Sequence, residues 1–424
     1  MAATTEFHRT IKTTSNTRQV VMGILFLVLG ILTWMVFIRE VAAGELAKFG
    51  MNATGLGSSN VGDWTIPSQP VLIFLAILMV GASAYQLIWG FGKYTNLALG
   101  IVVGLFVFAF LTWSTSGASL NLAGLLYNTL GAAVPITLAA FSGILSERAG
   151  VVNVAIEGMM LMGAMTAAIV ASVAHSLWIG LFSSILSAII LALVHGVLSI
   201  RYKTNQIVSG TVINIFATGL TSYIMTKYLL NYENLNNPGT FPPIPIPGLV
   251  NIPLIGEILF DNNIFVYIMF ILLFVLQIAL FRTRWGLRMR SVGEHPKAAD
   301  TLGINVIWTR YMAVVLSGAM AGFAGAYLTI GSVGQFGPLI TNGKGFIGLA
   351  AMIFGNWIPL GSFLAGLLFG FADSLSTKLG ILGIGIPSQF LLMMPYIATM
   401  IVLAGVVGRT RPPAADGVPY EKEG

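Results

Sequence analysis

The sequence contains no cysteine, and this absence excludes disulfides, thiolate catalysis and cysteine-ligated zinc. Histidine is scarce as well: its four copies are scattered along the chain, so no metal site is expected. Charge is the third shortage. Only 8% of the 424 residues are Asp, Glu, Lys or Arg, against about 25% in an average soluble protein. With so few charges and 56% hydrophobic residues, the chain is predicted to cross a membrane several times.

Catalytic and nucleotide-binding motifs are also missing. Residues 337–345, GPLITNGKG, are superficially similar to a phosphate-binding loop, but the spacing differs and Gly345 replaces the Ser or Thr that would hold magnesium. No set of nucleophile, base and orienting residue is visible either. We therefore predict that the chain is not an enzyme and binds no cofactor. If it moves a solute uphill, the energy comes from a gradient or from a separate subunit.

Long apolar runs dominate what is present. Crossing about 30 Å of hydrocarbon takes roughly 20 apolar residues in a helix. Runs of about this length lie at residues 20–38, 70–90, 96–113, 121–143, 151–174, 177–199, 206–230, 262–281, 310–331, 361–378 and 388–407. A shorter run, 345–357, is interrupted around Gly355 and Pro359 and predicts a half-helix or re-entrant segment. The predicted fold class is an all-α transmembrane bundle of about eleven spans plus this broken segment. Small-residue spacings at Gly318–Gly322 and Gly366–Gly370 predict close helix packing.

Lysine and arginine cluster in alternate connections between the predicted spans. Basic residues precede the first span and follow the second, fourth, sixth, eighth and last, whereas residues 114–120, 231–261 and 379–387 contain none. Because basic loops stay in the cytoplasm, both termini are predicted to be cytoplasmic. The net charge of +6 is interpreted as an orientation signal, and no nucleic-acid partner is expected. The first apolar run is too long for a signal peptide and is expected to be retained.

The two longest connections have distinctive compositions. Residues 231–261 are rich in proline and asparagine, which predicts either a cap over the outer mouth of the bundle or a plain linker. In the cytoplasmic loop 282–310, Pro296 suits the first turn of a helix and Gly303 the position after its end.

The short helix predicted at 296–302 would turn Ala298, Ala299 and Leu302 outward. Such a small, smooth surface fits a groove on another protein. The equally weighted alternative is a helix that lies on the lipid headgroups, helped by neighbouring arginines.

Glu157 and Asn153 interrupt a run that otherwise has the composition of a buried membrane span. Four positions apart, they share one face if the segment is helical. A carboxylate at bilayer depth normally faces a cavity or the bundle interior. Glu157 therefore either lines a solute or ion pathway or makes a structural contact, for example with Arg148. Other polar residues in apolar runs are more often links between helices than ligand contacts: Asn128, Asn214, Gln335 and Asn356. For Asp373, a structural and a functional role carry equal weight.

Three stretches resemble the membrane-spanning permease subunits of bacterial ABC importers, in the superfamily of the ribose and branched-chain amino acid permeases. Residues 143–164, GILSERAGVVNVAIEGMMLMGA, are similar to the signature of its nucleoside (simple-sugar-like) branch. Residues 284–306, RWGLRMRSVGEHPKAADTLGINV, resemble the loop that docks on the ATPase, and residues 343–375 resemble the second discontinuous helix. This likeness divides the chain into extra N-terminal helices (1–118), a core permease domain (119–408) and a cytoplasmic tail (409–424).

The resemblance implies a non-enzymatic permease subunit that imports a nucleoside, or a similar small neutral solute, by alternating access. Its implied location is the bacterial cytoplasmic (inner) membrane. The implied partners are ABC ATPase subunits, a second homologous permease in a heterodimer, and an extracytoplasmic substrate-binding lipoprotein. A sugar or branched-chain amino acid permease is the alternative within the superfamily, and a gradient-driven secondary transporter is the alternative outside it.

The resemblance also implies roles for residues. The set expected to line the pathway or form a gate is Asn153, Glu157, Asn214, Gln335 and Asn356. The set expected in an ATPase-coupling helix is Glu294, Pro296, Ala298, Ala299 and Gly303. Arg148 marks the cytoplasmic side, and Glu157 lies about two and a half turns further in, at roughly 3.6 residues per turn. This depth favours a gate or helix-locking role for Glu157 over that of a mid-membrane cargo ligand.

Overall fold

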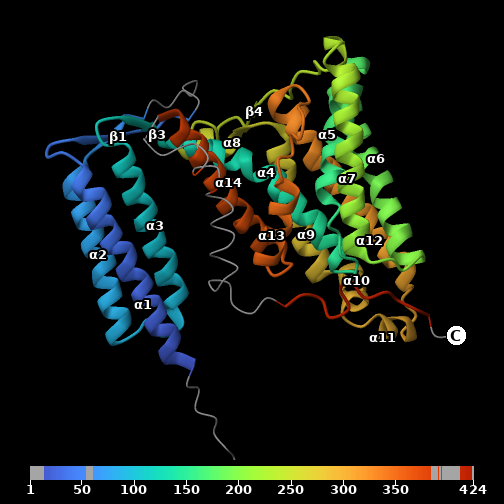
Figure 1. Ribbon diagram of the computed structural model, residues 1–424, viewed down its shortest axis with the longest axis horizontal. Helices are drawn as coiled ribbons and strands as arrows, with labels where there is room; N and C mark the ends of the chain where they lie inside the picture. Colours follow the sequence, from blue (N-terminus) through green and yellow to red (C-terminus); the bar gives the residue numbers. More distant parts are fainter. Residues whose placement is uncertain (1–13, 54–60, 383–389, 391–392, 394–410, 423–424) are drawn as a thin grey trace, which may run out of the picture. The chain divides into compact units, whose positions relative to one another are not determined.

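The computed structural model describes residues 14–53, 61–382, 390, 393 and 411–422, and helices make up most of it (Figure 1). Its internal contacts divide the chain into two compact units. Met1–Asn52 and Asn60–Ala123 form the first, here called the N-terminal unit. Ala53–Ser59 and Gly124–Gly424 form the second, here called the core unit.

The N-terminal unit consists of three long helices and a small sheet. Its helical elements are α1 (Thr14–Leu32), which continues as the π-helix η1 (Thr33–Ile38), α2 (Ser68–Ile88), η2 (Gly92–Tyr94) and α3 (Thr95–Ser114). In the sheet, the central strand β1 (Leu46–Gly50) pairs antiparallel with β2 (Trp64–Pro67) and parallel with β3 (Ser119–Asn121). The rings of Phe49, Trp64 and Phe108 lie against one another and join this sheet to α3.

The core unit is a bundle of long helices with shorter elements at its ends. The long helices are α4 (Leu122–Glu147), α5 (Ile156–Ala174), α6 (Leu177–Gly196), α7 (Gln206–Ile224), α9 (Ile264–Arg282), α12 (Val306–Ala326) and α14 (Pro359–Leu382). The shorter elements are η3 (Val197–Arg201), η4 (Met225–Leu229), η5 (Glu233–Leu235), β4 (Ile244–Pro245), α8 (Ile255–Phe260), β5 (Asp261–Asn262), α10 (Arg284–Glu294), α11 (Pro296–Thr301), η6 (Tyr327–Val333) and α13 (Lys344–Phe354).

Ten helices in the described part of the chain are long and apolar enough to cross a membrane. They match ten of the predicted spans, and α13 is the predicted half-helix. The prediction at 151–174 is wrong at its start, because α5 begins only at Ile156. The eleventh prediction, 388–407, falls almost wholly outside the described residues.

Small residues allow the helices at the centre of the core unit to approach closely, and α4 and α5 are largely buried there. A Cβ added at Gly322 would lie 2.7 Å from the Ser184 carbonyl oxygen of α6. A Cβ at Gly370 would lie equally close, at 2.7 Å, to the Thr129 carbonyl oxygen of α4. Close packing was predicted for both glycine spacings, and both predictions are confirmed.

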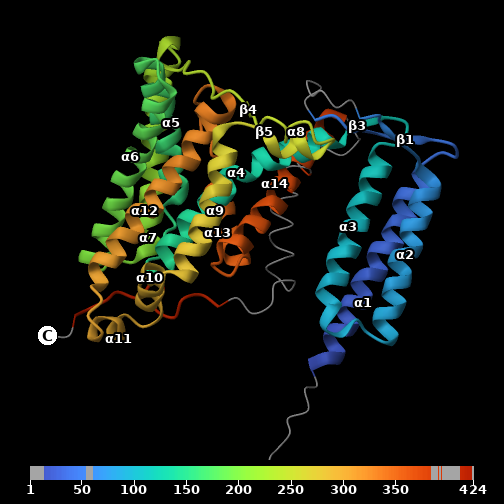
Figure 2. The same cartoon turned by 180° about the vertical axis from the view of Figure 1, so that it is seen from behind.

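The two ends of the core unit differ in what they carry. At one end lie α8, β4 and β5, and at the other lie α10, α11 and residues 411–422 (Figures 1 and 2). The second end holds the basic connections that the sequence assigns to the cytoplasm.

The helix predicted at 296–302 is present as α11, with Pro296 in its first turn and Gly303 just beyond its end at φ +80°. The prediction that Ala299 faces outward is wrong. Ala299 is buried against Val292 and Val306, whereas Ala298 and Leu302 are exposed. Consecutive positions on a helix differ by about 100° in direction, and here this step turns Ala299 toward α10 and α12 while Ala298 faces away.

Candidate functional site

The segment between α4 and α5 is not helical. Irregular backbone at membrane depth is tolerated only where protein groups satisfy its N–H and C=O groups. Here the Val152 N–H donates to Gln206 Oε1 at 2.7 Å, and His195 Nε2 donates to the Val152 carbonyl at 2.9 Å. Asn214 Nδ2 donates to the Val154 carbonyl at 2.9 Å. Side chains from α6 and α7 therefore hold open a break just before Glu157.

Two of the residues predicted to line a pathway, Asn153 and Asn214, support this break. Asn153 is fully buried, donates to Ser317 Oγ at 2.9 Å and accepts from the Ala155 N–H at 3.1 Å. Asn214 uses both ends of its amide, because its oxygen accepts from the Gly158 N–H at 2.8 Å. That N–H is one of those at the start of α5 that lack a partner within the helix. Asn153 and Asn214 thus fix the geometry of the break.

Glu157 joins the two broken helices. Its Oε1 accepts from the Gly343 N–H at 2.9 Å, and its Oε2 accepts from the Gly345 N–H at 2.6 Å. Both donors lie at the N-terminus of α13, where unpaired N–H groups and the helix dipole favour a negative charge. A Cβ on Gly345 would lie 2.7 Å from Glu157 Cα, so only glycine permits this approach. Both carboxylate oxygens are therefore committed to one helix end.

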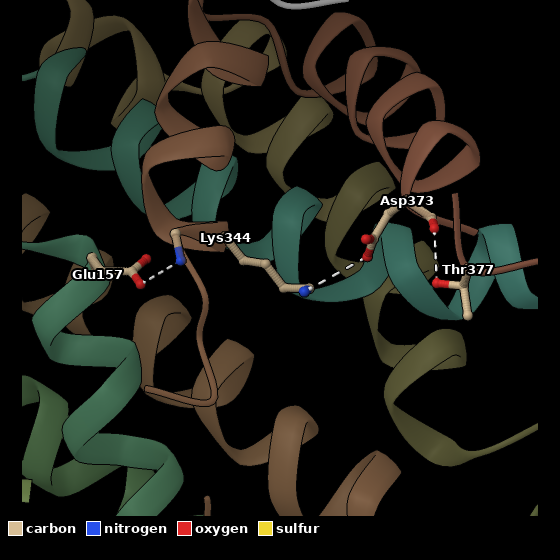
Figure 3. Close-up of polar contacts among 5 residues, drawn as sticks. Glu157, Lys344, Asp373 and Thr377 are labelled. Atoms are coloured by element: carbon tan, nitrogen blue, oxygen red, sulfur yellow. Dashed lines mark hydrogen bonds and ion pairs between the residues drawn. The ribbon is translucent and has the colours of Figure 1, made fainter. Parts of the chain in front are cut away.

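Lys344 stands between those two glycines and extends away from Glu157 toward Asp373 of α14 (Figure 3). Its Nζ lies 3.6 Å from Asp373 Oδ2. The Thr377 hydroxyl donates to the backbone carbonyl of Asp373 at 3.0 Å and leaves the carboxylate untouched. One row of contacts thus leads from the start of α5, through the start of α13, to the middle of α14.

A cavity of about 540 Å³ opens beside this ion pair. Its walls come from α4, β5 and the start of α9, η6, the start of α13, α14, and the proline-rich connection after α7. The cavity is lined by aromatic rings, by amides and by the two charged groups: Tyr127, Phe241, Tyr327, Asn128, Asn262, Asn263, Lys344 and Asp373. Such a lining, with apolar surface and a few convergent polar groups, is typical of a small-molecule site.

The polar lining residues differ in their freedom to bind a solute. Asn262 donates to the Ile258 carbonyl, and Asn263 caps the start of α9 by accepting from the Phe265 N–H at 3.2 Å. The Asn128 side chain is exposed and makes no hydrogen bond within the described residues. Phe241 packs edge-on against Phe265, which anchors the proline-rich connection to the bundle. This connection therefore forms part of the cavity wall, as the predicted cap would.

The other two predicted pathway residues lie elsewhere. Gln335 is exposed in the connection between η6 and α13 and is not among the lining residues. Asn356 lies in the turn between α13 and α14, where its carbonyl accepts from Arg148 at 3.2 Å. Of the five predicted residues, only Glu157 touches the row of contacts that reaches the cavity. Lys344 and Asp373 were not predicted as site residues, although two opposite charges in apolar surroundings signal a pair.

Residues 411–422 lie across the end of the core unit that carries α10 and α11. The Ala415 N–H donates to the Gly293 carbonyl at 2.8 Å, and the Ala414 N–H donates to Glu294 Oε2 at 3.2 Å. The Val418 carbonyl accepts from the buried Arg310 of α12 at 3.0 Å. Glu294, predicted for the coupling helix, is therefore bound by this tail. The tail ties the α10–α11 loop to α12.

Asp416 gives this tail a dependence on pH. Burial raises the pKa of Asp416 to about 6, although hydrogen bonds with Glu147 and with the Gly417 backbone, and the charge of Arg310, work in the opposite direction. Glu147 at the end of α4 is its acidic neighbour. Because docking of the tail raises the pKa of Asp416, the docked tail favours the protonated carboxyl. The free energy of docking therefore becomes less favourable as the pH rises from about 4 to about 6, and it stays at that weaker value above pH 6. The tail should be held more firmly in acid than at pH 8.

We expect Asp416→Asn to remove this dependence and to favour docking on the order of a hundredfold at pH 8, the value for about two pKa units. Because the chain lacks cysteine, a spin label on Ala414→Cys reports tail mobility directly. Mobility should rise between pH 5 and pH 8 in the parent and stay flat in Asp416→Asn. Asp300→Asn serves as the matched control. An unchanged pH profile in Asp416→Asn would assign the dependence to another group.

Among known proteins, residues 125–407 match the family model described as "Branched-chain amino acid transport system / permease component". A guanosine ABC transporter permease protein of Bacillus subtilis is 40% identical over 303 residues, covering 69% of this chain and 95% of that protein. A nucleoside ABC transporter permease protein of Lactococcus lactis is 40% identical over 305 residues, covering 70% and 96%. A putative glucose ABC transporter permease protein of Haloferax volcanii is 34% identical over 310 residues, covering 68% and 93%. No solved structure matches the chain.

Proposed function

The chain belongs to the family of permease components of branched-chain amino acid transport systems and is a multi-pass permease subunit of an ABC transporter, and from this membership we propose that it imports a nucleoside. A permease subunit is not an enzyme, and ATP hydrolysis belongs to its ATPase partner. The family also implies a substrate-binding partner.

The cavity beside the Lys344–Asp373 pair is the observation that carries the cargo proposal. Its volume of about 540 Å³ lies within the range of roughly 300–1,000 Å³ that is typical of small-molecule sites. Aromatic rings of Tyr127, Phe241 and Tyr327 suit a planar base, and the unpaired amide of Asn128 suits its polar edge. The one positive and one negative lining group cancel, which favours a neutral solute. The relatives named for guanosine and nucleosides support the same cargo.

The transport cycle would use the two ends of the core unit. At the cytoplasmic end, α11 would contact the ATPase through Ala298 and Leu302, the latter 81% exposed. Movement of α11 would reach the bundle through α10 and α12, between which Ala299 is packed. Nearer the cavity, Glu157 would act as the lock between α5 and α13. Shifting this lock would switch access from one side to the other.

The finer assembly is also part of the proposal. A second, homologous permease would complete the pathway as a heterodimer, and an external lipoprotein would deliver the cargo. The membrane would be the bacterial cytoplasmic membrane. The extra helices of the N-terminal unit lie outside the matched residues 125–407 and take no role in this scheme.

Uptake of radiolabelled guanosine by the complete transporter, with all partner subunits, tests the proposal. We expect competition by adenosine but not by ribose or leucine. Uptake should survive a proton uncoupler and disappear when the ATPase partner is inactivated by mutation. If only ribose or only leucine competes, the cargo is a different one. If uptake continues with an inactive ATPase partner and is abolished by the uncoupler, transport is driven by a gradient.

A further inference from the structure

We propose that Lys344 and Asp373 recognise the sugar part of the cargo by hydrogen-bonding a pair of adjacent hydroxyl groups. The proposal rests on the cavity as the solute site and deepens the nucleoside assignment. Recognition of both hydroxyl groups distinguishes ribonucleosides from their deoxy analogues.

The spacing of the pair leaves room for a ligand. The Nζ–Oδ2 distance of 3.6 Å exceeds the roughly 2.7–3.2 Å of an N–H···O hydrogen bond, so the two groups attract one another without being closed together. The Lys344 side chain is 18% exposed and that of Asp373 is 35% exposed. Within the described residues, the Asp373 carboxylate makes no hydrogen bond. Its acceptor positions are therefore open toward the cavity.

A purely structural purpose explains the pair poorly. Charges taken out of water repay their desolvation only with close geometry and further hydrogen bonds, and among the described residues this pair has neither. The helices α13 and α14 are already joined by a short turn, where a Cβ on Gly355 would lie 2.2 Å from the Ser362 nitrogen. Ionisable residues inside a membrane normally serve a solute pathway. Holding these two helices together does not require two charged groups in the cavity wall.

Two adjacent hydroxyl groups can supply the hydrogen bonds that Lys344 and Asp373 do not make within the described residues. The two oxygens of a carboxylate can each accept one O–H from neighbouring carbons, and the ammonium can donate to a hydroxyl or ring oxygen. Hydrogen bonds with one charged partner are the stronger kind. A neutral diol also leaves the net charge of the site at zero. A deoxy analogue leaves one carboxylate oxygen without a donor in a partly buried site. A site built to bind a hydroxyl group discriminates strongly against an analogue that lacks it for this reason.

Glu157 acts as a positioning residue for this pair. It holds the backbone N–H groups on either side of Lys344, at Gly343 and Gly345. The direction of the Lys344 side chain is thereby fixed toward Asp373, as Figure 3 shows. The signature carboxylate would set the geometry of sugar recognition without touching the sugar.

Transport rates of hydroxylated solutes and of their deoxy analogues test the proposal. Substitutions are made only in this permease, and the partner subunits are left unchanged. The complete transporter is assayed with guanosine and 2′,3′-dideoxyguanosine, and with ribose and 2-deoxyribose. Asp373→Asn is expected to lower the rate of guanosine uptake at least tenfold. The rate of 2′,3′-dideoxyguanosine uptake should stay within twofold of its rate in the unsubstituted transporter. Lys344→Met should act in the same direction, and Lys344→Arg should retain part of the discrimination. Asp63→Asn, which removes the ion pair of Asp63 with Lys48 in the N-terminal unit, is the matched control.

The outcomes separate this proposal from the cargo assignment. Equal loss for the hydroxylated and deoxy compounds, at unchanged permease levels, would overturn sugar recognition by the pair. Transport of ribose but not of nucleosides would overturn the nucleoside assignment, while the ratio of ribose to 2-deoxyribose would still decide the role of the pair. Transport of leucine alone would overturn both.

Discussion

Replacing Glu157 with glutamine is expected to lower the initial rate of cargo uptake at least tenfold without reducing the amount of permease in the membrane. The carboxylate accepts N–H groups from Gly343 and Gly345, one on each oxygen. Glutamine has a single acceptor oxygen, and its NH₂ group would face the second N–H as a competing donor. An unpaired buried N–H costs about 1–3 kcal/mol, and about 1.4 kcal/mol corresponds to a factor of ten in rate.

Uptake by the complete transporter, normalised to permease content in the membrane, measures this effect. Glu233→Gln, at an exposed position in η5, is the matched control and should transport normally. Gly345→Ala should reproduce the loss by a different route, because its Cβ would collide with the backbone of Glu157. Normal uptake in Glu157→Gln would mean that the contact between α5 and α13 is dispensable for transport.

The break before Glu157 shows where prediction from the sequence stopped. Composition and run length located the span, but 151–155 is as apolar as the helix that follows. The break depends on partners supplied by distant segments: His195 from α6, and Gln206 and Asn214 from α7. No local pattern encodes such partners. The expectation that Asn153 and Glu157 share one helix face failed for this reason, since only Glu157 lies within α5.

The same limit applies at the two ends of the core unit. Helix α11 and its capping residues were predictable, because proline and glycine act locally. The burial of Ala299 was not, because Val292, Val306 and Tyr420 cover it from elsewhere in the chain. Lys344 and Asp373 each stand out as charges in apolar surroundings. Their pairing required the antiparallel arrangement of α13 and α14, which only the fold provides.

Introducing a charge at the exposed tip of α11 is expected to uncouple the transporter. Leu302 is 81% exposed, so Leu302→Asp should not disturb folding of the permease itself. If this leucine is buried against the ATPase, its removal forfeits about 1.5–3 kcal/mol of apolar burial, and the new carboxylate adds a desolvation penalty. Cargo-stimulated ATP hydrolysis should therefore fall at least tenfold, as should copurification of the ATPase.

The matched control is Leu249→Asp, because Leu249 is also an exposed leucine but lies in the proline-rich connection at the opposite end of the core unit. Ala299→Asp provides the contrast, since a charge at that buried position should lower the amount of folded permease itself. A Leu302→Asp complex that copurifies intact and hydrolyses ATP at the parent rate with cargo would place the ATPase contact outside α11. The other exposed connections at the same end of the core unit would then be the next surface to test.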